Sequence, residues 1–214
     1  MAKSRDPSKP LRLGVLLSGS GRTLLNLLKE IKDDRLHAVV AVVIASRECL
    51  GAQRARDAGL KTVVVPYKRI LSIDAYSQRI GEVLYGARTD LVLQAGFLSL
   101  WYVPLRYQGC VMNIHPALLP DFGGKGMYGH RVHEAVLAAG RKESGCTVHF
   151  VTNEYDDGPI ILQRRVPVLE GDTPDSLAAR VFEQECIAYP EAVRLFAEAR
   201  LSIEDGEVQI APGL

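Results

Sequence analysis

The sequence lacks the cysteine pattern that marks metal sites and disulfide frameworks. Only four cysteines occur in 214 residues, and they show neither CxxC spacing nor paired cysteine and histidine ligands. Zinc binding and structural disulfides are therefore not expected, and reduced thiols are expected instead, at Cys49, Cys110, Cys146 and Cys186.

The sequence also lacks an excess of charge of one sign and any long apolar run. The 26 basic and 25 acidic residues give a formal net charge of +1, without the basic surplus typical of nucleic-acid binding. No apolar stretch approaches the length of a membrane span, and no signal-like segment follows the polar start MAKSRDPSKP. We therefore expect a cytoplasmic protein with no nucleic-acid or membrane partner.

What is present is enough apolar sequence for a core, since 47% of the residues are hydrophobic and 24% are charged. This balance suits one globular domain, and no repeat or change in composition marks a second one. We expect a disordered tail over 1–10, one domain over 11–200 and a hairpin or tail over 201–214.

Short apolar runs alternate with helical patterns through the first two thirds of the chain. Runs such as AVVAVVI are continuous, as in strands covered on both faces of a parallel sheet. The alternation predicts an α/β fold with a doubly wound, mostly parallel, Rossmann-like sheet. The predicted strands are 11–17, 38–44, 62–65, 91–95 and 110–114, and the predicted helices are 24–31, 49–58, 73–87 and 133–139.

After residue 145 the pattern changes. Two apolar runs, 145–151 and 160–168, are separated by the turn-rich loop 152–159 with no helix between them. They are predicted to pair antiparallel at the sheet edge. Asp172-Thr173-Pro174 then predicts the start of a long C-terminal helix that ends near Ala199.

The glycine turn Ser18-Gly19-Ser20-Gly21 joins the first predicted strand to the first helix. Free N–H groups at a helix start form a site for an anion such as phosphate, and Arg22 adds a cation there. The motif is neither a Walker loop nor a full dinucleotide fingerprint. A phosphate site and a plain tight turn therefore both remain open.

Asn113 and His115 lie at the carboxyl end of a predicted strand, where open parallel sheets bind their ligands. Residues two apart on a strand point to the same side, so an amide and an imidazolium could together hold an oxyanion. A turn beginning at Asn113, with His115 as a satisfied polar residue before Pro116, explains the same pattern.

Asp156 and Asp157 could supply a carboxylate to His115 if the loop 152–159 folds back over this strand. A carboxylate there would raise the pKa of His115 and keep the imidazolium populated near neutral pH. Turn chemistry accounts for the D-D-G-P sequence equally well. No serine has the nucleophile-elbow pattern, and the histidines show no metal-ligand spacing, so a catalytic metal is not expected.

Five motifs, in order and spacing, resemble the formyltransferase family that uses 10-formyltetrahydrofolate. The resemblance covers residues 11–200 and rests on Ser18-Gly19-Ser20-Gly21, Ala95-Gly96-Phe97, Asn113-Ile114-His115-Pro116 with Leu118-Leu119-Pro120, Thr147-Val148-His149-Phe150-Val151, and Asp156-Asp157-Gly158-Pro159-Ile160-Ile161.

The resemblance implies transfer of a formyl group from 10-formyltetrahydrofolate, as co-substrate and without a metal, to the amine of 5-phosphoribosylglycinamide in purine biosynthesis. Chain length supports this acceptor, because the family members that act on methionyl-tRNA or hydrolyse the folate carry an additional domain. Hydrolysis by the same residues, and phosphate binding without catalysis, are the alternatives. A monomer and a homodimer are both compatible with the sequence.

The resemblance also implies roles for single residues. Asn113 and His115 would hold the oxyanion, and Asp156 would pair with His115 and help relay a proton. The substrate phosphate would contact Gly21, Arg22 and Thr23, the ribose hydroxyls would contact Glu185, and the folate would contact Leu98, Ser99, Leu100, Trp101 and Asn113. The chain departs from its relatives at Ser99 and Ile73, where arginines are common and where Lys68 or Arg69 could substitute for the latter, and at Gly123, where proline is common.

Overall fold

The computed structural model describes residues 9–67, 70 and 72–213. The chain forms two compact units, residues 1–112 and 113–214. The predicted disordered tail lies outside the described residues except for residues 9 and 10, and Lys68 and Arg69 also lie outside them. The assignment of a single domain to 11–200 stays a prediction.

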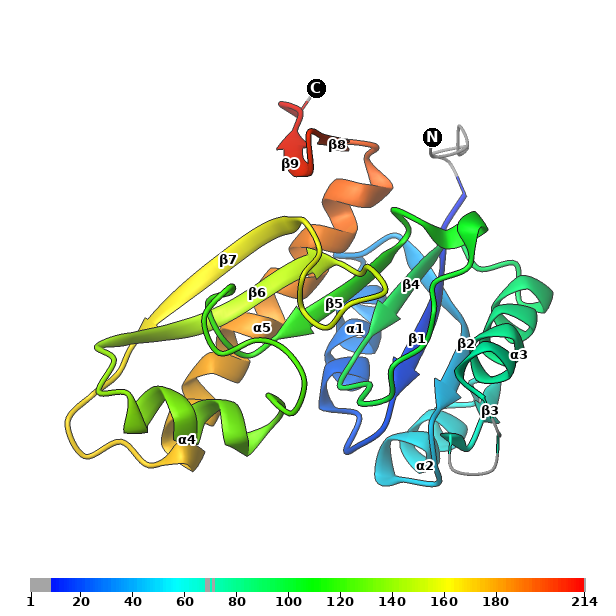
Figure 1. Ribbon diagram of the computed structural model, residues 1–214. Helices are drawn as coiled ribbons and strands as arrows, with labels where there is room; N and C mark the ends of the chain where they lie inside the picture. The colour runs from blue at the N-terminus through cyan, green and yellow to red at the C-terminus, as the bar shows by residue number, and fades with distance from the viewer. Residues whose placement is uncertain (1–8, 68–69, 71, 214) are drawn as a thin grey trace. The chain divides into compact units, whose positions relative to one another are not determined.

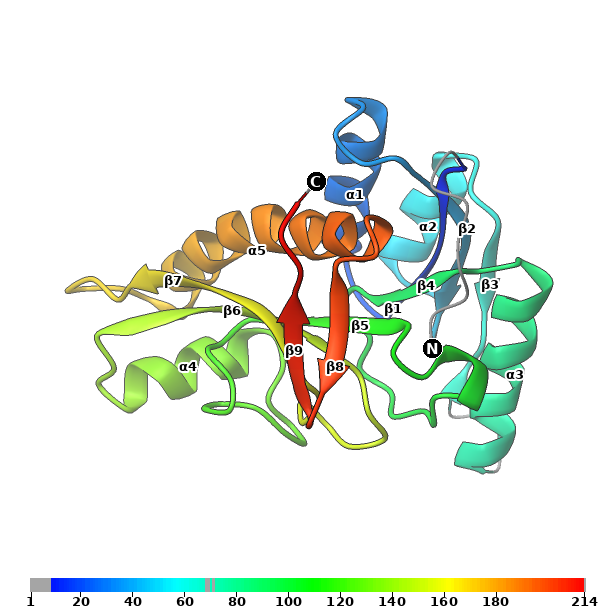
Figure 2. The ribbon, with the colours of Figure 1, turned by 90° about the horizontal axis from the view of Figure 1, so that it is seen from above.

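The first unit contains a parallel sheet with the strand order β3-β2-β1-β4 (Figure 1). Helices α1 and α2 lie on one face of this sheet and α3 lies on the other (Figure 2). Right-handed crossovers explain this arrangement, because the strand order reverses direction between β3 and β4. The elements are β1 (Leu11–Leu17), α1 (Arg22–Lys32), β2 (Ala38–Ala45), α2 (Leu50–Asp57), β3 (Thr62–Val64), α3 (Ile73–Gly86), β4 (Leu91–Gln94) and the 3₁₀ turn η2 (Leu105–Tyr107).

The core of the first unit explains why its strands read as continuous apolar runs. Six of the seven β1 residues are buried, as expected for a strand with helices on both faces. Gly14 of β1 has no room for a side chain, because an added Cβ would lie 2.5 Å from Leu84 of α3. Helix α3 therefore packs closely onto the middle of this strand.

The second unit is built on an antiparallel pair, β6 (Glu143–Phe150) and β7 (Ile160–Pro167). The long helix α5 (Pro174–Ala197) packs along both strands (Figure 1). It begins with a capping box in which Thr173 and Ser176 bond each other's backbone N–H groups. Helix α4 (His130–Ala138) precedes β6, and β8 (Leu201–Glu204) and β9 (Glu207–Ile210) form a terminal hairpin.

The remaining strand, β5 (Val111–His115), spans the division between the two units. The predicted fold class is confirmed: a mostly parallel α/β sheet with an antiparallel C-terminal edge and a long C-terminal helix. Among the described residues, none of the helices combines the length and apolarity needed to span a bilayer.

Candidate active site

The three predicted catalytic side chains meet within the second unit. Asn113 and His115 end β5, and Asp156 lies in the loop between β6 and β7. The Asn113 Nδ2 group donates to Asp156 Oδ1 at 3.3 Å, and His115 Nδ1 lies 3.5 Å from Asp156 Oδ2. One carboxylate therefore contacts both proposed oxyanion donors.

A fourth polar side chain, His149 at the end of β6, belongs to the same cluster and was not predicted. Its Nδ1 lies 2.8 Å from the Phe150 carbonyl oxygen, which can only accept, so Nδ1 carries the proton. Its Nε2 is then free to accept from Asn113 Nδ2 at 3.2 Å. The sequence signal was the i, i+2 pair Thr147 and His149 in the strand that leads into the Asp156 loop.

The backbone of residues 122–124 holds the same cluster from another side. His115 Nε2 donates to the Phe122 carbonyl at 2.8 Å, and the Gly124 N–H donates to Asp156 Oδ2 at 3.0 Å. Between them, a Cβ on Gly123 would lie 2.6 Å from Leu119 and 3.3 Å from Asp156. Glycine at this position therefore allows the backbone to approach the Asp156 carboxylate.

Buried hydrogen bonds fix the turn that follows β5. The Thr147 hydroxyl donates to the Ala117 carbonyl at 2.6 Å and accepts from the Leu119 N–H at 3.0 Å. Gln163 of β7 donates to the Leu119 carbonyl at 2.9 Å. The turn is thus anchored to both strands of the antiparallel pair.

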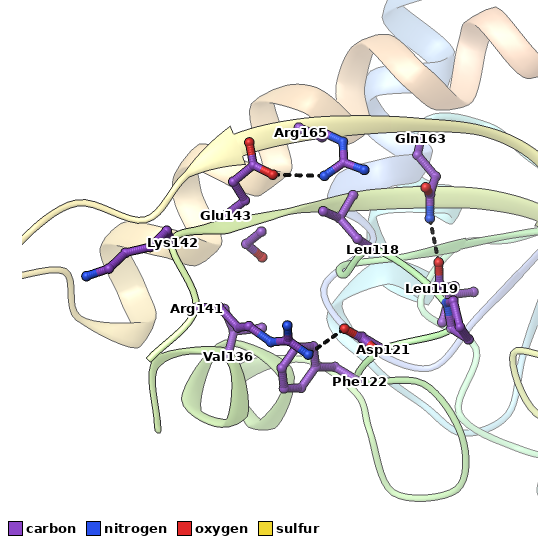
Figure 3. A pocket seen from close by; sticks show the side chains of 12 residues that line it. Leu118, Leu119, Asp121, Phe122, Val136, Arg141, Lys142, Glu143, Gln163 and Arg165 are labelled. Atoms are coloured by element: carbon purple, nitrogen blue, oxygen red, sulfur yellow. Dashed lines mark hydrogen bonds and ion pairs between the residues drawn. The ribbon is translucent and has the colours of Figure 1, made fainter. Parts of the chain in front are cut away.

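Beside this turn lies a pocket of about 410 Å³ (Figure 3). Its rim carries two ion pairs, Arg141–Asp121 at 2.6 Å and Arg165–Glu143 at 2.8 Å, and both pairs are exposed to solvent. None of the predicted site residues lines the pocket. The pocket lies next to the turn in the second unit, and Asn113, His115 and Asp156 are not among the residues that line it.

The protonation state of His115 differs from the sequence-based prediction. Burial lowers the pKa of His115, and this effect outweighs the Asp156 charge and the Phe122 hydrogen bond, which both raise it. The prediction of a raised pKa, and of a populated imidazolium at neutral pH, is therefore wrong. The motif identified the carboxylate partner but not how completely the ring is removed from water.

Asp156 is ionised in the same site. Burial raises the pKa of its carboxyl, but the neighbouring His149 and His115 rings and the hydrogen bond from the Gly124 N–H together lower it below its usual value. The resting cluster thus contains a carboxylate beside a neutral His115.

The predicted phosphate loop lies in the first unit. Gly21 has a φ of 75° at the start of α1, and an added Cβ would lie 2.7 Å from the Gly51 backbone. The first turn of α1, which includes Arg22 and Thr23, has no acidic residue and no side-chain cap. Such a helix start is suited to an anion. Arg54 donates to the Ser20 carbonyl at 2.7 Å and so adds a second cation beside the loop.

The predicted folate segment, Leu98 to Trp101, also lies in the first unit. Leu98 is partly exposed, whereas Trp101 is buried. Glu185, predicted to contact the ribose, lies on α5 of the second unit. Its charge acts on Cys146, whose pKa is raised to about 12, first by burial and then by Glu185. In the part of the chain that the structure describes, no three His, Cys, Asp or Glu side chains are placed to hold a metal ion.

The sequence and the fold correspond to a known family. The formyl transferase family model matches residues 11–193, and the chain belongs to this family. A chloroplastic phosphoribosylglycinamide formyltransferase of Vigna unguiculata is 40% identical over 89% of this chain and 62% of its own length. The phosphoribosylglycinamide formyltransferase of Escherichia coli (strain K12) is 34% identical, and the match covers 91% of each chain.

A solved structure agrees with these sequences. Glycinamide ribonucleotide transformylase 1 from Symbiobacterium toebii is 42% identical, with a TM-score of 0.87 over 95% of each chain. The chain thus spans most of the two bacterial relatives but less than two thirds of the plant one.

Proposed function

We propose that this protein transfers the formyl group of 10-formyltetrahydrofolate to the amine of 5-phosphoribosylglycinamide, a step of purine biosynthesis. The observation that carries the proposal is the contact of Asp156 with both Asn113 and His115. Family membership and the names of the bacterial relatives support the same activity.

In the proposed reaction the amine nitrogen attacks the formyl carbon, and the carbonyl electron pair moves onto oxygen. When the carbonyl re-forms, the bond from carbon to N10 of the folate breaks, and the amine proton passes to N10. The Asn113 amide and His115 would donate to the oxyanion, and Asp156 would help relay the proton. No covalent intermediate with the enzyme is required.

The site as it stands requires a change in hydrogen bonding when substrates bind. Both N–H bonds of the Asn113 amide are directed at protein acceptors, His149 and Asp156, and His115 Nε2 donates to Phe122. An oxyanion would compete for these donors, and its negative charge would raise the pKa of His115 in the transition state. The lowered pKa at rest is therefore compatible with protonation of His115 during the reaction.

The remaining contacts are part of the proposal. Gly21, Arg22 and Thr23 would hold the substrate phosphate, Glu185 the ribose hydroxyls, and Leu98, Ser99, Leu100 and Trp101, with Asn113, the folate. A metal-free reaction, a cytoplasmic location, a monomeric or homodimeric state and the absence of nucleic-acid or membrane partners stay predictions. The plant relative, for its part, is named as chloroplastic.

One experiment tests the activity and its alternatives. The protein is incubated with 10-formyltetrahydrofolate in the presence and in the absence of 5-phosphoribosylglycinamide, and release of tetrahydrofolate is followed. Release that depends on the acceptor supports transfer, release without the acceptor indicates a hydrolase, and no release indicates a binding protein. His115→Ala is expected to lower turnover by about 10² to 10³. His130→Ala, which changes an exposed histidine of α4, is the matched control.

A further inference from the structure

Ser18 lies at the point where β1 leads into the phosphate loop, and all its polar groups are engaged. Its N–H donates to the Gly96 carbonyl at 3.0 Å, and its carbonyl accepts from Arg47 Nε at 3.0 Å. Its hydroxyl accepts from the Leu98 N–H at 3.0 Å and lies 2.6 Å from the Ser46 hydroxyl. The residue is only 1% exposed.

These bonds connect two segments that the proposed function assigns to different ligands. Ser18 is continuous with the loop 18–21, proposed to hold the substrate phosphate. Its N–H and hydroxyl also bond both sides of Phe97, at the start of the folate segment 98–101. A shift of the loop on phosphate binding would therefore be transmitted to Leu98, because neither bond tolerates much displacement.

The other end of the folate segment is held in the same way by a serine that lies outside the phosphate loop 18–21. The Ser77 hydroxyl of α3 accepts from the Tyr102 N–H at 2.7 Å and donates to the Ile73 carbonyl at 2.7 Å. Ser77 is also buried. The two ends of the segment thus carry the same type of hydrogen bond, but the Ser18 bond comes from the phosphate loop and the Ser77 bond comes from α3.

We propose that Ser18 is a positioning residue that couples binding of the phosphorylated amine to binding of the folate. The inference rests on the proposed function. Since linkage is reciprocal, each ligand should raise the affinity of the other by the same factor. Loss of the Ser18 hydroxyl removes the bond to Leu98, which is the bond that reaches the folate segment 98–101, and should remove this factor although the N–H bond to Gly96 remains.

The test measures binding by calorimetry, without turnover. The dissociation constant of 5-phosphoribosylglycinamide is determined alone and with saturating tetrahydrofolate, which has no formyl group to transfer. For the unaltered protein we expect the folate to tighten binding at least about 5-fold. In Ser18→Ala we expect this ratio to fall to about 1, with weaker binding of each ligand alone.

Ser77→Ala is the matched control, because it removes the same kind of bond from the other end of the segment. It should weaken folate binding while the coupling ratio stays at the unaltered value. Ser46→Ala should also keep the ratio, because it leaves the Ser18 bond to Leu98 in place.

A merely structural role for Ser18 would lower thermal stability without changing the ratio. If Ser18→Ala does not fold, Ser18→Cys replaces it, since a thiol is a weaker acceptor of similar shape, and a reduced ratio is then expected.

A ratio that survives in Ser18→Ala, or that is lost equally in Ser77→Ala, overturns the inference. Binding of both ligands to the unaltered protein without coupling overturns it as well and leaves the proposed function standing. If neither ligand binds the unaltered protein, the proposed function fails together with the inference.

Discussion

His115 lies between two oxygen acceptors, the Phe122 carbonyl and the Asp156 carboxylate. Both would favour a proton on the nitrogen that faces them, which is the imidazolium form. Burial acts against that form, and the net result is a lowered pKa. In the proposed reaction, Asp156 would therefore matter less for the resting state than for the moment when negative charge develops on the substrate.

Asp156→Asn tests this role. The amide oxygen can still accept from the Gly124 N–H, but the charge that raises the pKa of His115 is lost. We expect kcat to fall by about 10² to 10⁴, the range for lost acid–base assistance, with little change in KM for the phosphorylated amine. Steady-state kinetics between pH 6 and 9 measure both constants. Asp157→Asn is the control, and an equal loss in both variants would contradict the assignment.

At the residue scale, the sequence predicted which side chains meet but not their environment. Spacing along a strand placed Asn113 and His115 on the same side but left a plain turn as an alternative, and the family resemblance singled out Asp156 from the D-D-G-P loop. His149 was not predicted, because its contact with Asn113 depends on where β6 ends relative to the loop that carries Asp156. No local sequence pattern contains that information. The direction of the His115 pKa was wrong for a similar reason, since burial is a property of the packed site.

At the scale of elements, the loop between β6 and β7 is held against the strand that precedes it. Gly158 lies so close to the Phe150 carbonyl that a Cβ on it would overlap the oxygen. Asp156, two residues earlier, has a φ of 52°, which is strained for a residue with a side chain. A tight approach at Gly158 thus fixes the loop that carries Asp156, the proposed catalytic carboxylate.

Gly158→Ala should displace this loop. We expect about a 10²-fold lower kcat, because misplacement of a catalytic group by about 1 Å has an effect of that order. We also expect a loss of about 1 to 3 kcal/mol in unfolding free energy, as is typical of overpacking. Turnover and urea denaturation measure the two effects. Gly86→Ala, at a position where a Cβ meets no atom within 4 Å, should keep full turnover.

Most elements could be predicted from the sequence to within two residues at each end, because apolar runs and glycine or proline signals agree with one another. Helix α4 was the exception: it begins at His130 rather than His133. Gly129, which precedes it, has a φ of 56° and a ψ of −134°, a conformation accessible to glycine and outside the usual capping pattern. Pro190 inside α5 gave no interruption, although proline removes a helical hydrogen bond.

At the scale of the whole molecule, one buried group is expected to control stability in mild acid. His133 of α4 is 4% exposed, and its Nδ1 has no hydrogen-bond partner among the described residues. Burial, followed by the charges of His130 and His115, lowers its pKa to about 4. In the unfolded chain the value returns to about 6.5.

The unfolded state therefore binds more protons than the folded state between about pH 6.5 and 4. The contribution of neutral His133 to stability is complete above pH 6.5 and is lost as the pH falls toward 4. Between pH 7.5 and 5.0 this difference in proton binding corresponds to about 2 kcal/mol. Nδ1 of His133 has no hydrogen-bond partner among the described residues. An apolar side chain of similar size should therefore fit this position without leaving a neighbouring polar group unpaired.

His133→Leu should accordingly flatten the dependence of stability on pH. Urea denaturation at pH 7.5 and 5.0 gives the unfolding free energy of each protein, and the variant should lose about 2 kcal/mol less than the unaltered chain over this interval. The comparison across pH is internal to each protein, so any packing defect of leucine cancels. Equal losses in the two proteins would show that His133 does not titrate on unfolding. The acid sensitivity would then arise at other groups. Buried His115 would be the next residue to test, because burial lowers its pKa as well.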